Sequence, residues 1–188
     1  MSSTAIRLSA FSYVVLTLVG RTGATAPELA EMMGRGRLYW AAPRSQWFAE
    51  PKRLHAAGLL DAAEEPGRTG PRTRYTLTAE GRAALAEWVR TPVGLPKIQQ
   101  EAVVRVLAAD LLDDPADVLT GLASLRADLA RARDDTAAAE AAAAGLPGRS
   151  ERLLVQHRMA HRLLDAIEAW ADEVEDLLAA DPGAPTPS

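Results

Sequence analysis

Residues 43–56 place polar and basic side chains at helical spacing, opposite an apolar face. At about 100° per residue, Trp47, Pro51 and Leu54 fall on one side of a helix. The opposite side carries small, polar and basic residues: Ser45, Ala49, Lys52 and Ala56, with Gln46 and Arg53 beside them. Hydroxyl, amide and guanidinium groups hydrogen-bond to base edges in a DNA major groove, and alanine contacts the thymine methyl. This helix face is therefore suited to a DNA major groove.

We expect this helix to make two kinds of contact with DNA. Ser45 and Gln46, with Arg44 beside them, are predicted to reach base edges or nearby phosphates. Lys52 and Arg53 are predicted to bind backbone phosphates. The alternative is a solvated helix whose polar side chains bind nothing, and for any single residue the sequence leaves that alternative open.

The segment that follows the helix predicts a β-hairpin with a basic tip. Gly58 suits the end of the helix, and residues 59–77 read as two strands around a Pro- and Gly-rich turn at 66–71. The basic residues of the hairpin are Arg68 at the tip and Arg72 and Arg74, which share one face of the return strand. Arg68 is predicted to enter the minor groove, and the other two to anchor the hairpin to phosphates. Replacing either Arg72 or Arg74 by alanine is then expected to reduce the slope of log affinity against log salt concentration by about one unit.

Capped and amphipathic segments on both sides of this stretch predict the elements that hold it. Segments 9–19 and 25–33 read as two helices, and Thr78 is the expected N-cap of another. Three helices and a hairpin in this order are typical of a winged helix-turn-helix. The Pro-containing segment 91–96 interrupts the helical pattern, so residues 1–91 are predicted to form a DNA-binding domain.

Residues 92–180 are predicted to form a second, entirely helical domain, with 181–188 as a disordered tail. Apolar residues alternate at spacings of four and three through 118–143 and 153–178, on either side of a Gly-Pro turn. The pattern predicts an antiparallel, coiled-coil-like dimerisation domain. A lone hairpin of this kind leaves an apolar face uncovered, so a second copy of the chain is the simplest expected partner. The fold class is thus mainly α with one small β-hairpin wing.

Two shorter features are expected before that helical hairpin. Residues 98–112 read as one helix, and the next helix is predicted to start at Asp114 and Pro115, which suit the N-cap and first helical positions.

The balance of charge differs between the two halves of the chain. The net charge of −4 by itself argues against a nucleic-acid-binding protein. Residues 1–94, however, carry twelve Lys and Arg against eight Asp and Glu, whereas residues 95–188 carry nine against seventeen. A basic half joined to an acidic half fits a DNA-binding module followed by a module with another role.

Composition excludes several classes of protein. The 188 residues include no cysteine, which rules out disulfides and thiolate metal sites. No apolar run has transmembrane length and the N-terminal residues do not read as a secretory signal, so no membrane association and a cytoplasmic location are expected. No nucleophile–base set, paired carboxylates or phosphate loop is recognisable, so we predict no enzyme, no cofactor and no catalytic residues.

Residues 36–90 resemble the PadR-like transcriptional regulators, specifically the larger members with a long helical C-terminal region. The motifs that carry the resemblance are Ser45-Gln46, Phe48, the run Lys52-Arg53-Leu54 and the strand–helix junction YTLTAEGR at 75–82. The resemblance implies a homodimer that binds a palindromic operator in double-stranded DNA, usually as a repressor, with the C-terminal helices forming the dimer. Two positions depart from the family pattern: Ala26-Pro27 replaces a Gly-Tyr pair, and Pro51 replaces a common leucine and predicts a kink.

The resemblance also implies an aromatic effector, because relatives bind phenolic or multi-ring compounds near the junction of the two domains. The candidate residues for this ligand are Trp40, Trp88 and Trp170, and Trp170 is the preferred candidate because it lies one residue off the helical seam at Ala171. The alternative is that Trp40 and Trp88 belong to the core of the winged-helix domain.

Two further alternatives concern the helical half. His157, His161 and Asp165 have the i, i+4, i+8 spacing of a metal site, but packing and a charge pair on a helix face explain the same spacing, so no metal is predicted. The whole chain also fits a protein-interaction scaffold in which a winged helix and a coiled coil bind proteins and not DNA.

Overall fold

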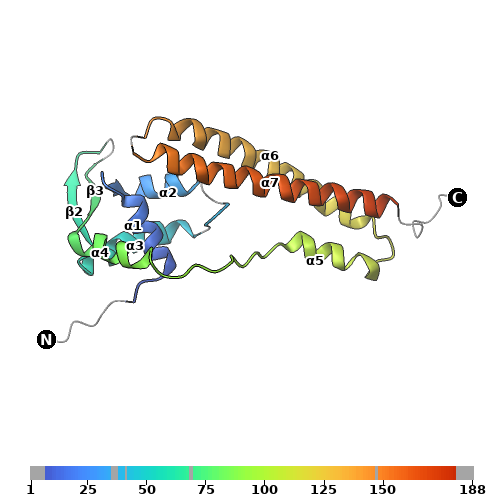
Figure 1. Ribbon diagram of the computed structural model, residues 1–188, viewed down its shortest axis with the longest axis horizontal. Helices are drawn as coiled ribbons and strands as arrows, with labels where there is room; N and C mark the ends of the chain where they lie inside the picture. The colour runs from blue at the N-terminus through green and yellow to red at the C-terminus, as the bar shows by residue number, and fades with distance from the viewer. Residues whose placement is uncertain (1–6, 35–37, 41, 68–69, 147, 181–188) are drawn as a thin grey trace. The chain divides into compact units, whose positions relative to one another are not determined.

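The computed structural model describes residues 7–34, 38–40, 42–67, 70–146 and 148–180. The chain divides into two compact units, residues 1–95 and residues 96–188. Most of the described residues are helical and the strands belong to the first unit, which confirms the mainly α fold class (Figure 1). None of the described helices has both the length and the apolar character needed to span a membrane. The tail expected at 181–188 lies outside the described residues.

The first unit has the order of elements of a winged helix-turn-helix domain. Its elements are α1 (Ala10–Val19), β1 (Ala24–Thr25), α2 (Ala26–Gly34), α3 (Arg44–Ala56), β2 (Leu60–Glu65), β3 (Arg72–Leu77) and α4 (Ala79–Trp88). β3 is the central strand of an antiparallel sheet, with β2 on one side and β1 on the other. β2 and β3 are the predicted hairpin wing, whereas the two-residue β1 was missed because it lies in a stretch that reads as a turn.

Side-chain caps define where three of these helices begin. Ser9 accepts the amide of Ser12 at 3.2 Å at the start of α1, and Ser12 accepts the amide of Ser9 at 2.9 Å. Thr25 and Glu28 form the predicted capping box of α2. Thr78 caps α4 by accepting a backbone amide at 2.9 Å. The three predicted helix starts are therefore confirmed.

The core of the first unit lies between α1, α2, α3 and the sheet. Trp47, Pro51 and Leu54 are buried on one face of α3, as the helical spacing predicts. Trp47 meets the ring of Phe11 edge-on, with 4.6 Å between the ring centroids. α3 is continuous across Pro51, whose ring is fully buried, and the expected kink stays a prediction. Gly58 ends the α3 segment with a φ of 76°, a conformation that glycine adopts without strain.

The second unit begins differently from the helix predicted at 98–112. The structure has a shorter helix, α5 (Glu101–Leu107), followed by a 3₁₀ turn, η1 (Ala109–Leu111). The amide of Ala108 is shared between the carbonyls of Val104 and Arg105, the geometry in which an α-helix tightens into a 3₁₀ turn. The predicted helix was therefore too long at both ends.

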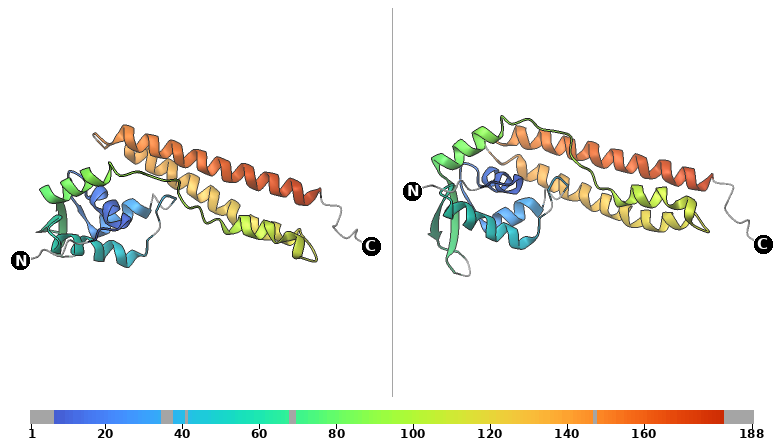
Figure 2. Two further views of the ribbon diagram at one scale, coloured as in Figure 1. Left: turned by 60° about the horizontal axis from the view of Figure 1, so that its bottom comes forward. Right: turned by 90° about the horizontal axis from the view of Figure 1, so that it is seen from below.

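Two long helices, α6 (Asp117–Ala143) and α7 (Ser150–Ala179), lie side by side in the second unit (Figures 1 and 2). Asp114 accepts the amide of Ala116 at 2.9 Å, so α6 starts after the turn capped by Asp114 and not at Pro115. The buried residues that form the seam are Val118, Leu122, Leu129, Thr136 and Ala143 in α6, and Ala160, Leu164, Ala171, Val174 and Leu178 in α7. The alternating apolar pattern of the sequence thus marks the packed faces of an antiparallel helical pair.

Candidate nucleic-acid interface

The face of α3 that carries the predicted DNA contacts is open to solvent. Arg44, Ser45 and Gln46 are exposed in its first turn, and Ala49 and Lys52 follow on the same side. Arg44 lies over the ring of Phe48, 5.8 Å from the centroid, a distance at which a cation is attracted to the ring face. Lys52 makes no ion pair with another described residue. The predicted division of α3 into a buried and an exposed face is therefore confirmed.

Arg53 differs from its neighbour Lys52. Its Nε and Nη2 donate to the two carboxylate oxygens of Glu50 at 2.9 and 2.6 Å. Its Nη2 also donates to the hydroxyl of Ser12 in α1 at 2.9 Å. The hydrogen bond from Arg53, which outweighs the opposing effect of burial, lowers the pKa of Glu50 below its ordinary value. The guanidinium therefore ties α3 to α1, and its predicted contact with phosphate stays a prediction.

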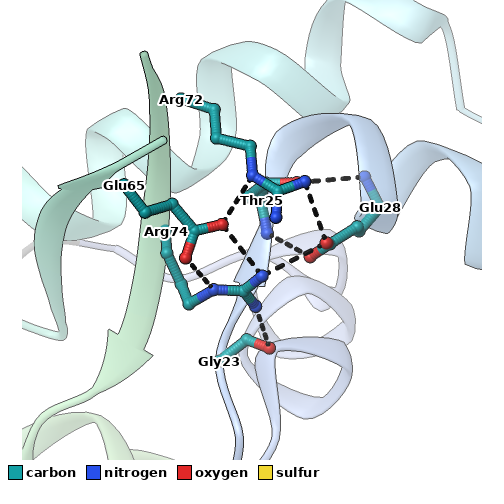
Figure 3. Close-up of polar contacts among 6 residues, drawn as sticks. All are labelled: Gly23, Thr25, Glu28, Glu65, Arg72 and Arg74. Atoms are coloured by element: carbon teal, nitrogen blue, oxygen red, sulfur yellow. Dashed lines mark hydrogen bonds and ion pairs between the residues drawn. The ribbon is translucent and has the colours of Figure 1, made fainter. Parts of the chain in front are cut away.

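The basic residues of the wing fall into two groups. Arg68 lies outside the described residues. Arg72 and Arg74 share one face of β3, as predicted, and both form ion pairs with Glu28 and Glu65 (Figure 3). These carboxylate partners were not predicted from the sequence. Two signals pointed to them: the Thr25–Glu28 capping box next to the sheet, and a hairpin register that places Glu65 opposite Arg72.

The three candidate tryptophans have different surroundings. Trp40 stacks near Phe11, with 6.4 Å between centroids, and lines a cavity of about 420 Å³ in the first unit. Arg44 and Trp47 line the same cavity. Trp88 stacks on Tyr13 at 4.7 Å with an interplanar angle of 4°. Trp170 belongs to the second unit, where it packs against the cluster that contains Val118, Leu122 and Val174.

The two histidines of α7 differ: His161 faces a carboxylate, whereas the buried Nδ1 of His157 has no hydrogen-bond partner among the described residues. His161 Nε2 lies 3.4 Å from a carboxylate oxygen of Glu140. Asp165 accepts a hydrogen bond from Arg133 at 2.8 Å, which is a charge pair between the two long helices. Within the part of the chain that the structure describes, no group of three or more potential metal ligands comes together.

The exposed face of α3, the hairpin wing and the helical second unit together define a winged helix-turn-helix protein with a long helical region. Comparison with solved structures identifies proteins that share this fold. PadR from Bacillus subtilis in complex with operator DNA matches with a TM-score of 0.72 and 19% identity, covering 93% of this chain and 98% of that one. The same protein in complex with p-coumaric acid matches with a TM-score of 0.66 and 20% identity, covering 91% and 98%.

A third match is the virulence activator AphA from Vibrio cholerae, with a TM-score of 0.70 and 23% identity, covering 91% of this chain and 99% of that one. No protein-family model matches the sequence, and no curated protein matches it. The chain therefore has the fold of the PadR-like transcriptional regulators, the family whose motifs its sequence resembles.

Proposed function

We propose that this protein is a sequence-specific, DNA-binding transcriptional regulator and not an enzyme. The single observation that carries the proposal is the exposed face of α3, where Arg44, Ser45, Gln46 and Lys52 stand together on a helix whose other face is buried. The hydroxyl, amide and cationic groups of this face can form hydrogen bonds with base edges and phosphates in a major groove. The fold shared with a PadR protein solved on its operator supports the same function.

Within the proposed interface the residues have separate tasks. Ser45 and Gln46 hydrogen-bond to base edges. Their hydroxyl and amide groups both donate and accept hydrogen bonds, and they are exposed in the first turn of α3. Arg44 reaches base edges or the adjoining phosphates, and Lys52 binds a phosphate further along the groove. Arg68 inserts its guanidinium in the minor groove at the tip of the wing.

The proposed regulator acts in the cytoplasm as a homodimer on a palindromic operator, most simply as a repressor. Exposed apolar side chains of the second unit support a second copy: Val104 is 65% exposed, Leu107 73% and Leu111 81%. An apolar surface of this kind is normally covered by a protein partner. Two copies related by twofold symmetry would present two α3 helices to half-sites about 34 Å apart.

A small aromatic effector is proposed to control the dimer. The p-coumaric acid complex of Bacillus subtilis PadR shows that a protein of this fold accepts such a ligand. Of the three tryptophans, Trp40 is favoured by its place on the cavity wall beside Arg44. An aromatic carboxylate in that cavity would pair with Arg44 and so remove a proposed DNA contact. Titration of tryptophan fluorescence with p-coumaric acid, compared between Trp40→Phe, Trp88→Phe and Trp170→Phe, identifies the residue that reports binding.

Selection of bound sequences from a pool of random duplexes tests the main proposal. The 188-residue chain is expected to enrich a palindrome and to bind it about a thousandfold more tightly than unselected DNA, or more, as is typical of specific DNA binding. Enrichment of no sequence would favour the alternative, a protein-interaction scaffold that uses the same fold.

A further inference from the structure

Two carboxylates and two arginines meet at the base of the wing (Figure 3). Glu65, the last residue of β2, pairs with Arg72 across the hairpin. Arg74 is two residues further along β3, so its side chain lies on the same face of the sheet. Glu28 approaches this face from the first turn of α2. The cluster joins two negative and two positive groups.

Arg74 uses most of its hydrogen-bonding capacity inside this cluster. Its Nε and Nη2 donate to the two oxygens of Glu65 at 2.6 and 3.0 Å. Nη2 also donates to Glu28 at 3.2 Å, and Nη1 donates to the carbonyl of Gly23 at 3.1 Å. A guanidinium has five N–H groups, so these bonds leave about one for an acceptor outside the protein. Arg74 is therefore poorly placed to bind a phosphate without breaking contacts within the first unit.

Glu28 connects the wing to the helix-turn-helix through its two carboxylate oxygens. Oε2 accepts the amide of Thr25 at 2.9 Å and so caps α2. Oε1 lies 3.2 Å from Nη2 of Arg74 and 3.6 Å from Nη1 of Arg72. One side chain therefore caps the first helix of the helix-turn-helix and at the same time holds the wing.

The backbone confirms that the wing and the segment before α2 are in direct contact. Gly23 has a φ of 76°, and a Cβ at this position would lie 2.7 Å from the carbonyl oxygen of Tyr75. No side chain fits between them, so any other residue would force the turn away from β3. The hydrogen bond from Arg74 to the carbonyl of Gly23 holds the same approach.

In the described part of the wing, the buried apolar side chains lie in the half of the hairpin farther from the turn. Leu60 and Tyr75 are buried, with 1% and 4% of their surface exposed. The next four residues of β2, 61–64, are all exposed. β1 pairs with β3 as far as Thr25 opposite Arg74. Among the described residues, the side chains of the outer wing that contact the helical body and the turn before α2 are Arg72 and Arg74, which contact Glu28 and Gly23. Beyond the strand pairing at Arg74, the position of the wing therefore depends on this polar cluster.

We infer that Glu28 and Glu65 are positioning residues for DNA binding, which hold the wing at a set place relative to α2 and α3 through Arg72 and Arg74. The inference rests on the proposed function and assigns the arginines a different role from phosphate binding. Their charges are offset within the cluster, so they add little to the attraction between the wing and DNA. They act by presenting the wing tip and α3 to the duplex at a fixed separation.

Glu65→Gln separates positioning from phosphate binding because the two roles predict opposite signs. If the arginines neutralised phosphates, removing the carboxylate beside them would tighten binding and steepen its salt dependence. If the carboxylate positions the wing, Glu65→Gln weakens binding of the selected duplex by about tenfold, with no steeper salt dependence. Fluorescence anisotropy of a labelled duplex, measured with full-length protein over a range of salt concentrations, gives both quantities.

Glu64→Gln is the matched control. Glu64 precedes Glu65 on β2, points to the opposite face of the strand, and makes no ion pair with another described residue. Its substitution removes the same charge at nearly the same distance from DNA, and we expect binding to be unchanged or slightly tighter. Glu28→Gln is a second test variant, because glutamine at this position still completes a capping box but loses the charge that holds Arg74.

Amide hydrogen exchange of the wing, measured without DNA, gives an independent readout. The amides of 61–65 and 72–75 are expected to exchange faster in Glu65→Gln and Glu28→Gln than in Glu64→Gln. The inference is overturned if the wing amides exchange slowly in all three variants. It is also overturned if Glu65→Gln binds DNA as tightly as Glu64→Gln does. If the unsubstituted protein binds no duplex, the proposed function fails, and the exchange rates still decide whether the carboxylates hold the wing.

Discussion

Arg53 in α3 donates a hydrogen bond to the hydroxyl of Ser12 in α1, with 2.9 Å between the atoms. Ser12 is fully buried and also belongs to the capping box that starts α1. One hydroxyl thus links the start of the first helix to the helix that we propose for DNA recognition. Lys52, the residue before Arg53, points to solvent instead. Two adjacent basic residues of α3 therefore have different roles, one within the fold and one at the surface.

Substitution of these two residues distinguishes stability from DNA binding. Arg53→Ala is expected to lower the free energy of unfolding by about 1 kcal/mol, because Glu50 and Ser12 lose a partly buried partner. Lys52→Ala is expected to leave stability unchanged and to reduce the slope of log affinity against log salt by about one unit. Urea denaturation and a salt titration of DNA binding check the two outcomes. Equal stability of the two variants would show that the bond to Ser12 contributes nothing measurable.

Gln46→Ala is predicted to relax sequence specificity. A bidentate amide contact with a base discriminates by about 1–3 kcal/mol, so the variant is expected to lose roughly 5- to 150-fold in affinity for the selected duplex. Affinity for unrelated DNA is expected to stay the same, because phosphates and not bases determine it. Lys52→Ala is the control, since it is expected to lower the affinity for both duplexes by the same factor. A loss of equal size on both duplexes for Gln46→Ala would contradict the proposed base contact.

Leu107→Glu is predicted to weaken the proposed homodimer. Leu107 is 73% exposed on α5, so a glutamate there is tolerated in a single chain but is costly in an apolar interface. Sedimentation equilibrium is expected to show the dimer dissociating at a protein concentration at least tenfold higher than for the unsubstituted protein. Val89→Glu, at a residue of the first unit that is 68% exposed, is the control for the added charge. Identical association in both variants would place the dimer contact elsewhere.

The stability of the first unit is predicted to fall in acid. The hydrogen bond from Arg74 lowers the pKa of Glu65, and the contacts of Glu28 with the Thr25 amide and Arg74 lower the pKa of Glu28 despite the opposing effect of burial. A carboxyl with a lowered pKa in the folded state stabilises the protein at pH values above the ordinary pKa of a glutamate. That contribution is lost as the pH falls through the lower, folded-state pKa values.

Thermal unfolding between pH 7 and pH 3 measures this effect. The melting temperature is expected to be steady above about pH 5 and to decrease below it. Glu65→Gln should start from a lower melting temperature and decrease less, because it has already lost one of the titrating groups. A parallel decrease in the variant and the unsubstituted protein would assign the acid sensitivity to other carboxyls.

Local features of this protein follow from its sequence. Ser9, Thr25 and Thr78 cap helices where their hydroxyls precede helical segments, because a cap satisfies amides only a few residues away. The buried and exposed faces of α3 follow from the helical period, which any continuous helix must obey. The seam between α6 and α7 follows from the same periodicity.

The partners of the arginines were decided only by the tertiary structure. Arg53 meets Ser12 across 41 residues of sequence, and Arg74 meets Glu28 across 46. Helical and strand periods give the face of its own element on which each of these side chains lies. Which carboxylate or hydroxyl lies there depends on how α1, α2 and the wing pack together, and no local spacing specifies that arrangement. The same sequence pattern therefore fits an arginine that binds DNA and one that holds the reading elements in place.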